Sequence, residues 1–106
     1  MSNTMEQIAR IQQMEQQLDV ASQAVATLSD ALEQYASAQE AIDMLDNYYR
    51  SDTWRQDYAD DEAGRLPNTL KRGVLSEDGI WNLLTECRRL NLRLAEIAAE
   101  IDTPKA

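Results

Sequence analysis

A seven-residue hydrophobic repeat runs through the first half of the chain. One set of positions holds Ile11, Leu18, Val25 and Leu32, and a second set, three residues further on, holds Met14, Ala21, Leu28, Tyr35, Ile42 and Tyr49. This spacing is that of the a and d positions in helices that pack in a left-handed sense. It predicts one long helix over about residues 4–49, which we expect to start at a capping box of Thr4 with Gln7 or of Asn3 with Glu6.

The residues beside this repeat are mostly small. Ala24, Ser29, Ala31, Ala36 and Ala38 stand where a two-stranded coiled coil usually places Glu or Lys. Small flanks widen the buried face and let neighbouring backbones approach, so they favour a bundle of three or four helices over a simple zipper. Beyond residue 35 the repeat weakens, since polar residues take the a positions there, which indicates a change of packing partner.

The last segment has a second helical pattern. Its apolar residues alternate at spacings of three and four: Ile80, Leu83, Cys87, Leu90, Leu94, Ile97 and Ile101. They predict a helix over residues 77–102 that Ser76 caps, that a contact between Leu75 and Ile80 staples, and that Thr103 and Pro104 end. Cys87 lies within the stripe, and because the chain has no histidine to activate it, we expect a buried structural thiol.

Between these helices the pattern predicts a short helix over residues 52–63 and an ordered charged loop over residues 64–76. Ser51 or Asp52 is the expected N-cap of the short helix, and Gly64 is expected to end it in the left-handed conformation. Pro67 and Gly73 bracket a further turn, in which we expect a positive φ at Gly73. Five aromatic residues surround this region: Tyr48, Tyr49, Trp54, Tyr58 and Trp81. They predict a satellite core under the loop, or alternatively a rim around a ligand or peptide groove.

Together these elements predict an all-α protein with a single helical domain over residues 1–106. At 1.5 Å per residue the first helix would be roughly 65–70 Å long and the last roughly 40 Å, so the last cannot cover the first alone. We expect a long antiparallel helical hairpin or a small helical bundle with the middle segment packed at one end. A homodimer that buries the remaining apolar stripe is the alternative.

Composition agrees with one folded domain. The chain has 106 residues, of which 43% are hydrophobic, and a chain of this size can bury a core without metals or disulfides. Its single cysteine suits a reducing compartment. No apolar run approaches the roughly 18 residues that a membrane span needs, and the first residues lack the features of a signal peptide. We therefore expect a cytoplasmic protein that does not bind membranes.

The net charge of -9 is unevenly distributed. Residues 1–62 carry thirteen acidic and three basic residues, whereas residues 63–106 carry six acidic and seven basic ones. Since nucleic-acid phosphates need Lys and Arg to displace counterions, we expect no direct nucleic-acid binding. The acidity indicates a solvated face that keeps the protein soluble, or alternatively an inhibitor that imitates nucleic acid.

The middle insert concentrates charges of both signs, Asp60, Asp61 and Glu62 before Arg65, Lys71 and Arg72. The simplest interpretation is a local ion network that fixes the loop. Three functional alternatives are an anion site at Lys71 and Arg72, a divalent-cation site at the acids from Asp57 to Glu62, and general acid-base hydrolysis. The acids do not follow the spacing of a calcium loop, no nucleophile motif accompanies them, and the absence of histidine removes the ligands of di-iron and haem bundles.

The same insert carries a family resemblance. The runs over residues 61–67 (DEAGRLP) and 70–78 (LKRGVLSED), followed by Leu83 and Leu84 and preceded by Tyr49 and Trp54, resemble the family called domain of unknown function 4298. The resemblance covers nearly the whole chain. It implies a short, helical, bacterial cytosolic protein with no assigned activity, and hence no catalytic residue to transfer.

These observations lead us to expect a non-enzymatic protein-protein interaction module without cofactors or metals, which binds an unknown protein partner and can also bind a second copy of itself. The candidate contact residues are Asp60, Asp61, Glu62, Arg65, Lys71, Arg72, Trp54 and Trp81. The runner-up is a protein that binds a small anion or phosphate ligand through Arg65, Lys71 and Arg72.

Overall fold

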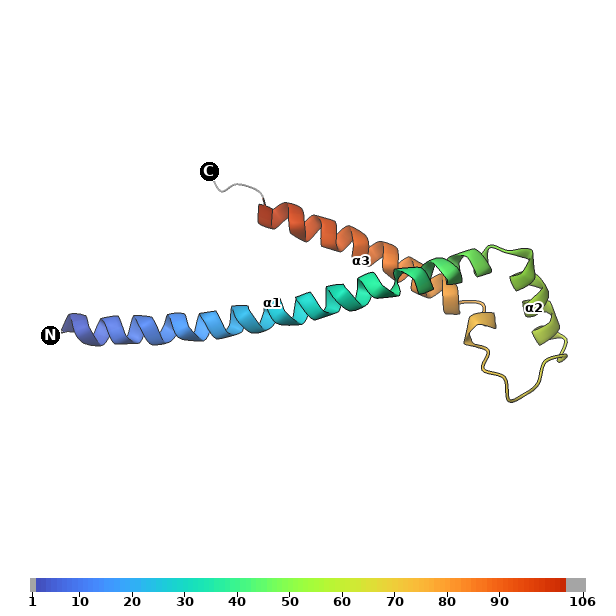
Figure 1. Ribbon diagram of the computed structural model, residues 1–106, viewed down its shortest axis with the longest axis horizontal. Helices are drawn as coiled ribbons and strands as arrows, with labels where there is room; N and C mark the ends of the chain where they lie inside the picture. Colours follow the sequence, from blue (N-terminus) through green and yellow to red (C-terminus); the bar gives the residue numbers. More distant parts are fainter. Residues whose placement is uncertain (1, 103–106) are drawn as a thin grey trace. The chain divides into compact units, whose positions relative to one another are not determined.

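The structure, a computed structural model, describes residues 2–102 (Figure 1). Its elements are the helices α1 (Ser2–Tyr49), α2 (Asp52–Glu62) and α3 (Gly79–Asp102), with a short 3₁₀ helix, η1 (Gly73–Leu75), ahead of α3. The described residues contain no β-strand, so the expected all-α class is confirmed. The predicted stop of the last helix at Thr103 and Pro104 lies outside the described residues.

The chain divides into two units, Met1–Gln39 and Glu40–Ala106, which we call the N-terminal and the C-terminal unit. The described part of the N-terminal unit consists only of helix α1 as far as Gln39, and the rest of that helix belongs to the C-terminal unit. That helix is continuous from Ser2 to Tyr49, so Asn3 and Thr4 lie inside it and the predicted capping box is wrong. No glycine or proline in the first residues opposes an earlier start of the helix.

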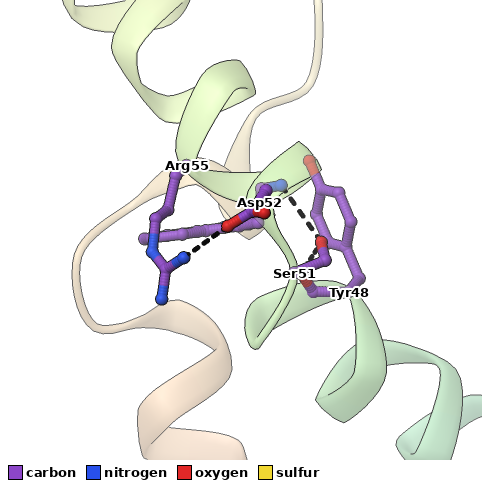
Figure 2. Close-up of polar contacts among 5 residues, drawn as sticks. Tyr48, Ser51, Asp52 and Arg55 are labelled. Atoms are coloured by element: carbon purple, nitrogen blue, oxygen red, sulfur yellow. Dashed lines mark hydrogen bonds and ion pairs between the residues drawn. The ribbon is translucent and has the colours of Figure 1, made fainter.

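A single serine organises the corner between α1 and α2. Figure 2 shows Ser51 between the end of one helix and the start of the next. Its Oγ accepts a hydrogen bond from the backbone N–H of Trp54 at 3.2 Å and donates one to the carbonyl of Tyr48 at 2.5 Å. Ser51 is therefore the N-cap of α2, one of the two predicted candidates, and it also satisfies a carbonyl at the end of α1.

The end of α2 follows the predicted turn chemistry. Gly64 has a φ of 72°, the left-handed conformation that a glycine adopts without steric cost. Its N–H donates to the carbonyl of Asp61 at 3.0 Å, and the N–H of Arg65 donates to the carbonyl of Asp60 at 2.9 Å. These bonds close the helix and direct the chain into the loop over residues 65–72.

The buried core of the C-terminal unit lies where η1 meets α3. Leu75 and Ile80 keep only 6% and 3% of their surface exposed, and they are the two buried hydrophobic residues among those described. Ser76 accepts a hydrogen bond from the N–H of Gly79 at 3.0 Å and donates one to the carbonyl of Gly73 at 2.8 Å. Ser76 thus makes the expected capping bond, although α3 begins only at Gly79.

Two glycines lie in this corner, and one of them differs from expectation. Gly73 does not have a positive φ, so the predicted left-handed conformation is wrong, and a Cβ added to it would meet no atom within 4 Å. A Cβ on Gly79 would instead lie 2.4 Å from the Gly73 carbonyl oxygen. Gly79 is therefore the residue whose lack of a side chain allows η1 and α3 to approach. Farther along α3, Cys87 is half-buried, not fully buried as predicted.

Candidate interaction surfaces

The apolar face of α1 is the largest exposed hydrophobic feature of the N-terminal unit. Every residue from 3 to 34 is exposed. The a and d residues of the heptad pattern are included, with exposed fractions of 51% for Ile11, 57% for Leu18, 67% for Val25 and 52% for Leu28. Small side chains leave a shallow hollow on this helix, lined by Ala21, Ser22, Val25, Ala26 and Ser29. We call the a and d positions from Ile11 to Leu32 the α1 face.

The structure contains part of the ion network that the sequence of the charged insert predicts. Arg65 pairs with Asp60 at 3.0 Å, and Arg72 pairs with Asp61 at 2.5 Å. The Arg72 guanidinium also donates to the Pro67 carbonyl at 2.6 Å. It therefore connects α2 to the loop, because one side chain bonds both an acid of the helix and a backbone carbonyl beyond it.

Two of the predicted insert residues stand apart from this network. Glu62 and Lys71 form no ion pair with any of the residues 2–102. Lys71 instead lines an open apolar groove of about 410 Å³, together with Leu45, Gly73, Val74, Gly79, Ile80 and Leu83. Because Arg65 and Arg72 are bound to acids, Lys71 is the cation of the insert that has no ionic partner within the described chain.

The aromatic residues form a cluster around Trp54. Its ring lies edge-on to Tyr49, with 4.8 Å between ring centroids, and is stacked on Tyr58 at 5.2 Å. The indole N–H donates to the carbonyl of Val74 at 2.8 Å, which joins α2 to η1. Trp81 remains 53% exposed and borders a separate depression next to Arg50 and Arg88. The rings around Trp54 thus contact one another as the expected satellite core requires, although all three are only half-buried, and Trp81 stays exposed.

Two tyrosine hydroxyls make hydrogen bonds that the sequence pattern does not indicate. Tyr48 donates to Asp57 at 2.6 Å, and burial, followed by this bond and the charge of Asp57, raises the pKa of Tyr48 to about 12. Tyr58 donates to Glu77 at 3.0 Å, and this bond is the main cause that raises the pKa of Tyr58. The two bonds join α1 to α2 and α2 to the segment before α3.

Three acids of the insert accept hydrogen bonds from other side chains. Asp57 accepts from Tyr48, and Asp60 and Asp61 accept from arginines. Across residues 2–102 no three acidic or cysteine side chains converge in a way that could hold a metal ion. None of the helices formed by these residues has the length and apolar character needed to cross a membrane.

Comparison with known proteins gives one match. No curated protein and no solved structure is significantly similar to this chain. The family described as domain of unknown function 4298 matches residues 11–97, which include most of α1, the whole charged insert and most of α3. Since this match covers far more than half of the chain, the protein belongs to the family called domain of unknown function 4298.

Proposed function

We propose that the protein is a non-enzymatic interaction module that binds a protein partner through the α1 face. The observation that carries this proposal is the exposure of a regular apolar heptad over residues 11–32, where Ile11, Leu18, Val25 and Leu28 each keep more than half of their surface in contact with solvent. Amphipathic helices in proteins gain most of their stability by packing such a face. A contiguous exposed apolar surface is typical of protein-protein contacts.

The C-terminal unit supports a structural role for the charged insert. Its arginines are engaged by Asp60 and Asp61, and Trp54 is bonded to the backbone of η1. These contacts join the loop to α2 and η1, and Lys71, Glu62 and Trp81 are exposed side chains outside these contacts that a partner could reach.

The test is affinity capture from lysate of the native host with the tagged full-length chain and two variants. Leu18→Glu/Leu28→Glu places two charges on the α1 face, and the control Gln16→Glu/Gln23→Glu places the same charges on the opposite side of the helix. We expect a partner to be retained by wild type and by the control and to be lost from the face variant. Equal capture by all three chains would place the contact surface elsewhere.

A second candidate function, binding of a small anion or phosphate ligand, is favoured by the position of Lys71. This lysine borders the apolar groove and has no ionic partner in the described chain. A phosphate compound at 100 times its dissociation constant should stabilise the protein by about 2.7 kcal/mol, and Lys71→Met should abolish that response. An absence of any thermal shift across a panel of phosphate compounds would contradict this candidate.

A further inference from the structure

The two charged residues that flank the α1 face have opposite signs. With Ile11 at a and Met14 at d, Arg10 occupies a g position and Glu15 the next e position. The other e and g positions from residue 8 to residue 38 are uncharged: Ile8, Gln17, Ser22, Ala24, Ser29, Ala31, Ala36 and Ala38. The remaining charges of the N-terminal unit take the outer b, c and f positions: Glu6, Asp19, Asp30 and Glu33.

Arg10 is the single basic residue among residues 1–39, and it lies beside the apolar face. Neither Arg10 nor Glu15 forms an ion pair with any other residue in the described part of the chain, and both are exposed. Their spacing of five residues is the separation between a g position and the e position of the following heptad. In a parallel coiled coil these two positions of neighbouring helices lie next to each other.

We propose that α1 binds a second copy of the chain in a parallel, in-register, two-stranded coiled coil, in which Arg10 of each copy pairs with Glu15 of the other. The small e and g residues that by themselves favour a larger bundle begin only at Ser22, beyond this charged pair. This inference rests on the proposed function, because it assigns the occupant of the same α1 face. The apolar layers from Ile11 to Tyr35 extend over about four heptads, which is long enough for a sustained coiled coil.

The charges select a second copy in the parallel orientation. An interface between two identical copies must be complementary to itself. A chain with one isolated base and one isolated acid beside its α1 face meets this requirement, because two Arg10–Glu15 pairs form across the interface. In an antiparallel pair g positions face g positions and e positions face e positions. Arg10 would then face a glutamine, an alanine or another Arg10, so neither charge would gain a partner.

A charge-reversal experiment tests the pairing in the full-length chain by sedimentation equilibrium. Arg10→Glu alone places two acids opposite each other in the dimer, and Glu15→Arg alone places two bases there. We expect each variant to dimerise about tenfold more weakly than wild type, because two favourable pairs become repulsive. An equimolar mixture restores opposite charges in the heterodimer and should recover the wild-type affinity.

A cross-linking experiment tests the register. In a Cys87→Ala background, Met14→Cys should form an intermolecular disulfide under mild oxidation, since residue 14 faces its own counterpart only in a parallel, in-register pair. A mixture of Met14→Cys with Val25→Cys would cross-link instead in an antiparallel pair in which Leu18 faces Ala21, because a positions then face d positions. Gln16→Cys, on the outer face of the helix, is the matched negative control.

The outcomes separate this inference from the proposed function. Dimerisation by wild type, weakening by either single reversal and recovery in the mixture support the parallel homodimer. A monomer at all concentrations, a trimer or tetramer, or cross-links of the antiparallel kind would overturn it. If the chain is monomeric but the α1 face still captures a different protein from lysate, the inference fails while the proposed function stands.

Discussion

Residues 3–34 and residues 40–102 differ in what their side chains contact. In the first range every residue is exposed, and the Gln23 side chain donates a hydrogen bond to the Thr27 hydroxyl one helical turn away. In the second range, side chains bond across nine to twenty positions of sequence, as in Tyr48 to Asp57 and Trp54 to Val74. The contacts given for the first region are thus local to one helix, whereas the second region also has contacts between side chains far apart in the sequence.

This difference has consequences for stability. A helix without packing partners is marginal in water, so the N-terminal unit should depend on whatever covers the α1 face. The C-terminal unit contains its own buried corner and its own polar connections between helices. Both tryptophans lie in the C-terminal unit, so their fluorescence reports its unfolding separately from the helical signal of the whole chain.

The largest expected effect follows from removing the core of the C-terminal unit. Ile80→Ala should destabilise this unit by about 2–5 kcal/mol, because it opens a cavity at the most buried hydrophobic residue described. Denaturant unfolding followed by tryptophan fluorescence measures the change at a fixed protein concentration. The control Leu92→Ala removes a side chain that is 66% exposed and should cost less than about 0.5 kcal/mol. Equal costs for the two variants would contradict the assigned core.

A smaller effect is expected from Gly79→Ala, at about 1–3 kcal/mol. The new Cβ would lie 2.4 Å from the Gly73 carbonyl oxygen, so the backbone of η1 or α3 has to shift. Gly73→Ala serves as the matched control, since its Cβ enters open space, and its stability should stay within about 0.5 kcal/mol of wild type. Thermal unfolding of the two variants compares them directly. A more stable Gly79→Ala protein would show that the close approach is absent.

The smallest effect concerns the corner between α1 and α2 and appears at high pH. The pKa of Tyr48 is raised to about 12, against about 10 for an unperturbed tyrosine. The protonated phenol is favoured in the folded state, so its contribution is present in full below pH 10 and is lost as the pH rises towards 12. Tyr48→Phe should reduce this pH dependence and cost about 0.5–1.5 kcal/mol at neutral pH.

Tyrosinate absorbance during a pH titration measures the ionisation of Tyr48 directly. Asp57→Asn keeps a hydrogen-bond acceptor but removes the charge, so Tyr48 should ionise at a lower pH in this variant. Since burial is the first cause of the raised pKa, the shift should be reduced and not abolished. An unchanged titration of Tyr48 in Asp57→Asn would remove Asp57 from the explanation.

Sequence reasoning found the features that depend on neighbouring residues. The heptad spacing predicted α1, although the helix starts before its predicted cap. Ser51 and Gly64 could be assigned to the two ends of α2 because capping and left-handed turns depend on one or two residues. The pairing of Asp60 with Arg65 was also predictable, since these charges lie five positions apart, whereas the pairing of Asp61 with Arg72 spans eleven positions and depends on the path of the loop.

Only the tertiary structure decided the long-range contacts. Trp54 could be predicted to pack near the loop, but its bond to Val74 depends on how the chain returns through η1. The path of the chain through η1 also brings Gly79 close to Gly73 and leaves Lys71 beside a groove instead of within the ion network. It leaves Trp81 exposed and apart from the other aromatic rings. A helix or a turn is fixed by bonds between residues three or four positions apart, whereas these contacts are fixed by the path of the intervening loop, which no local pattern encodes.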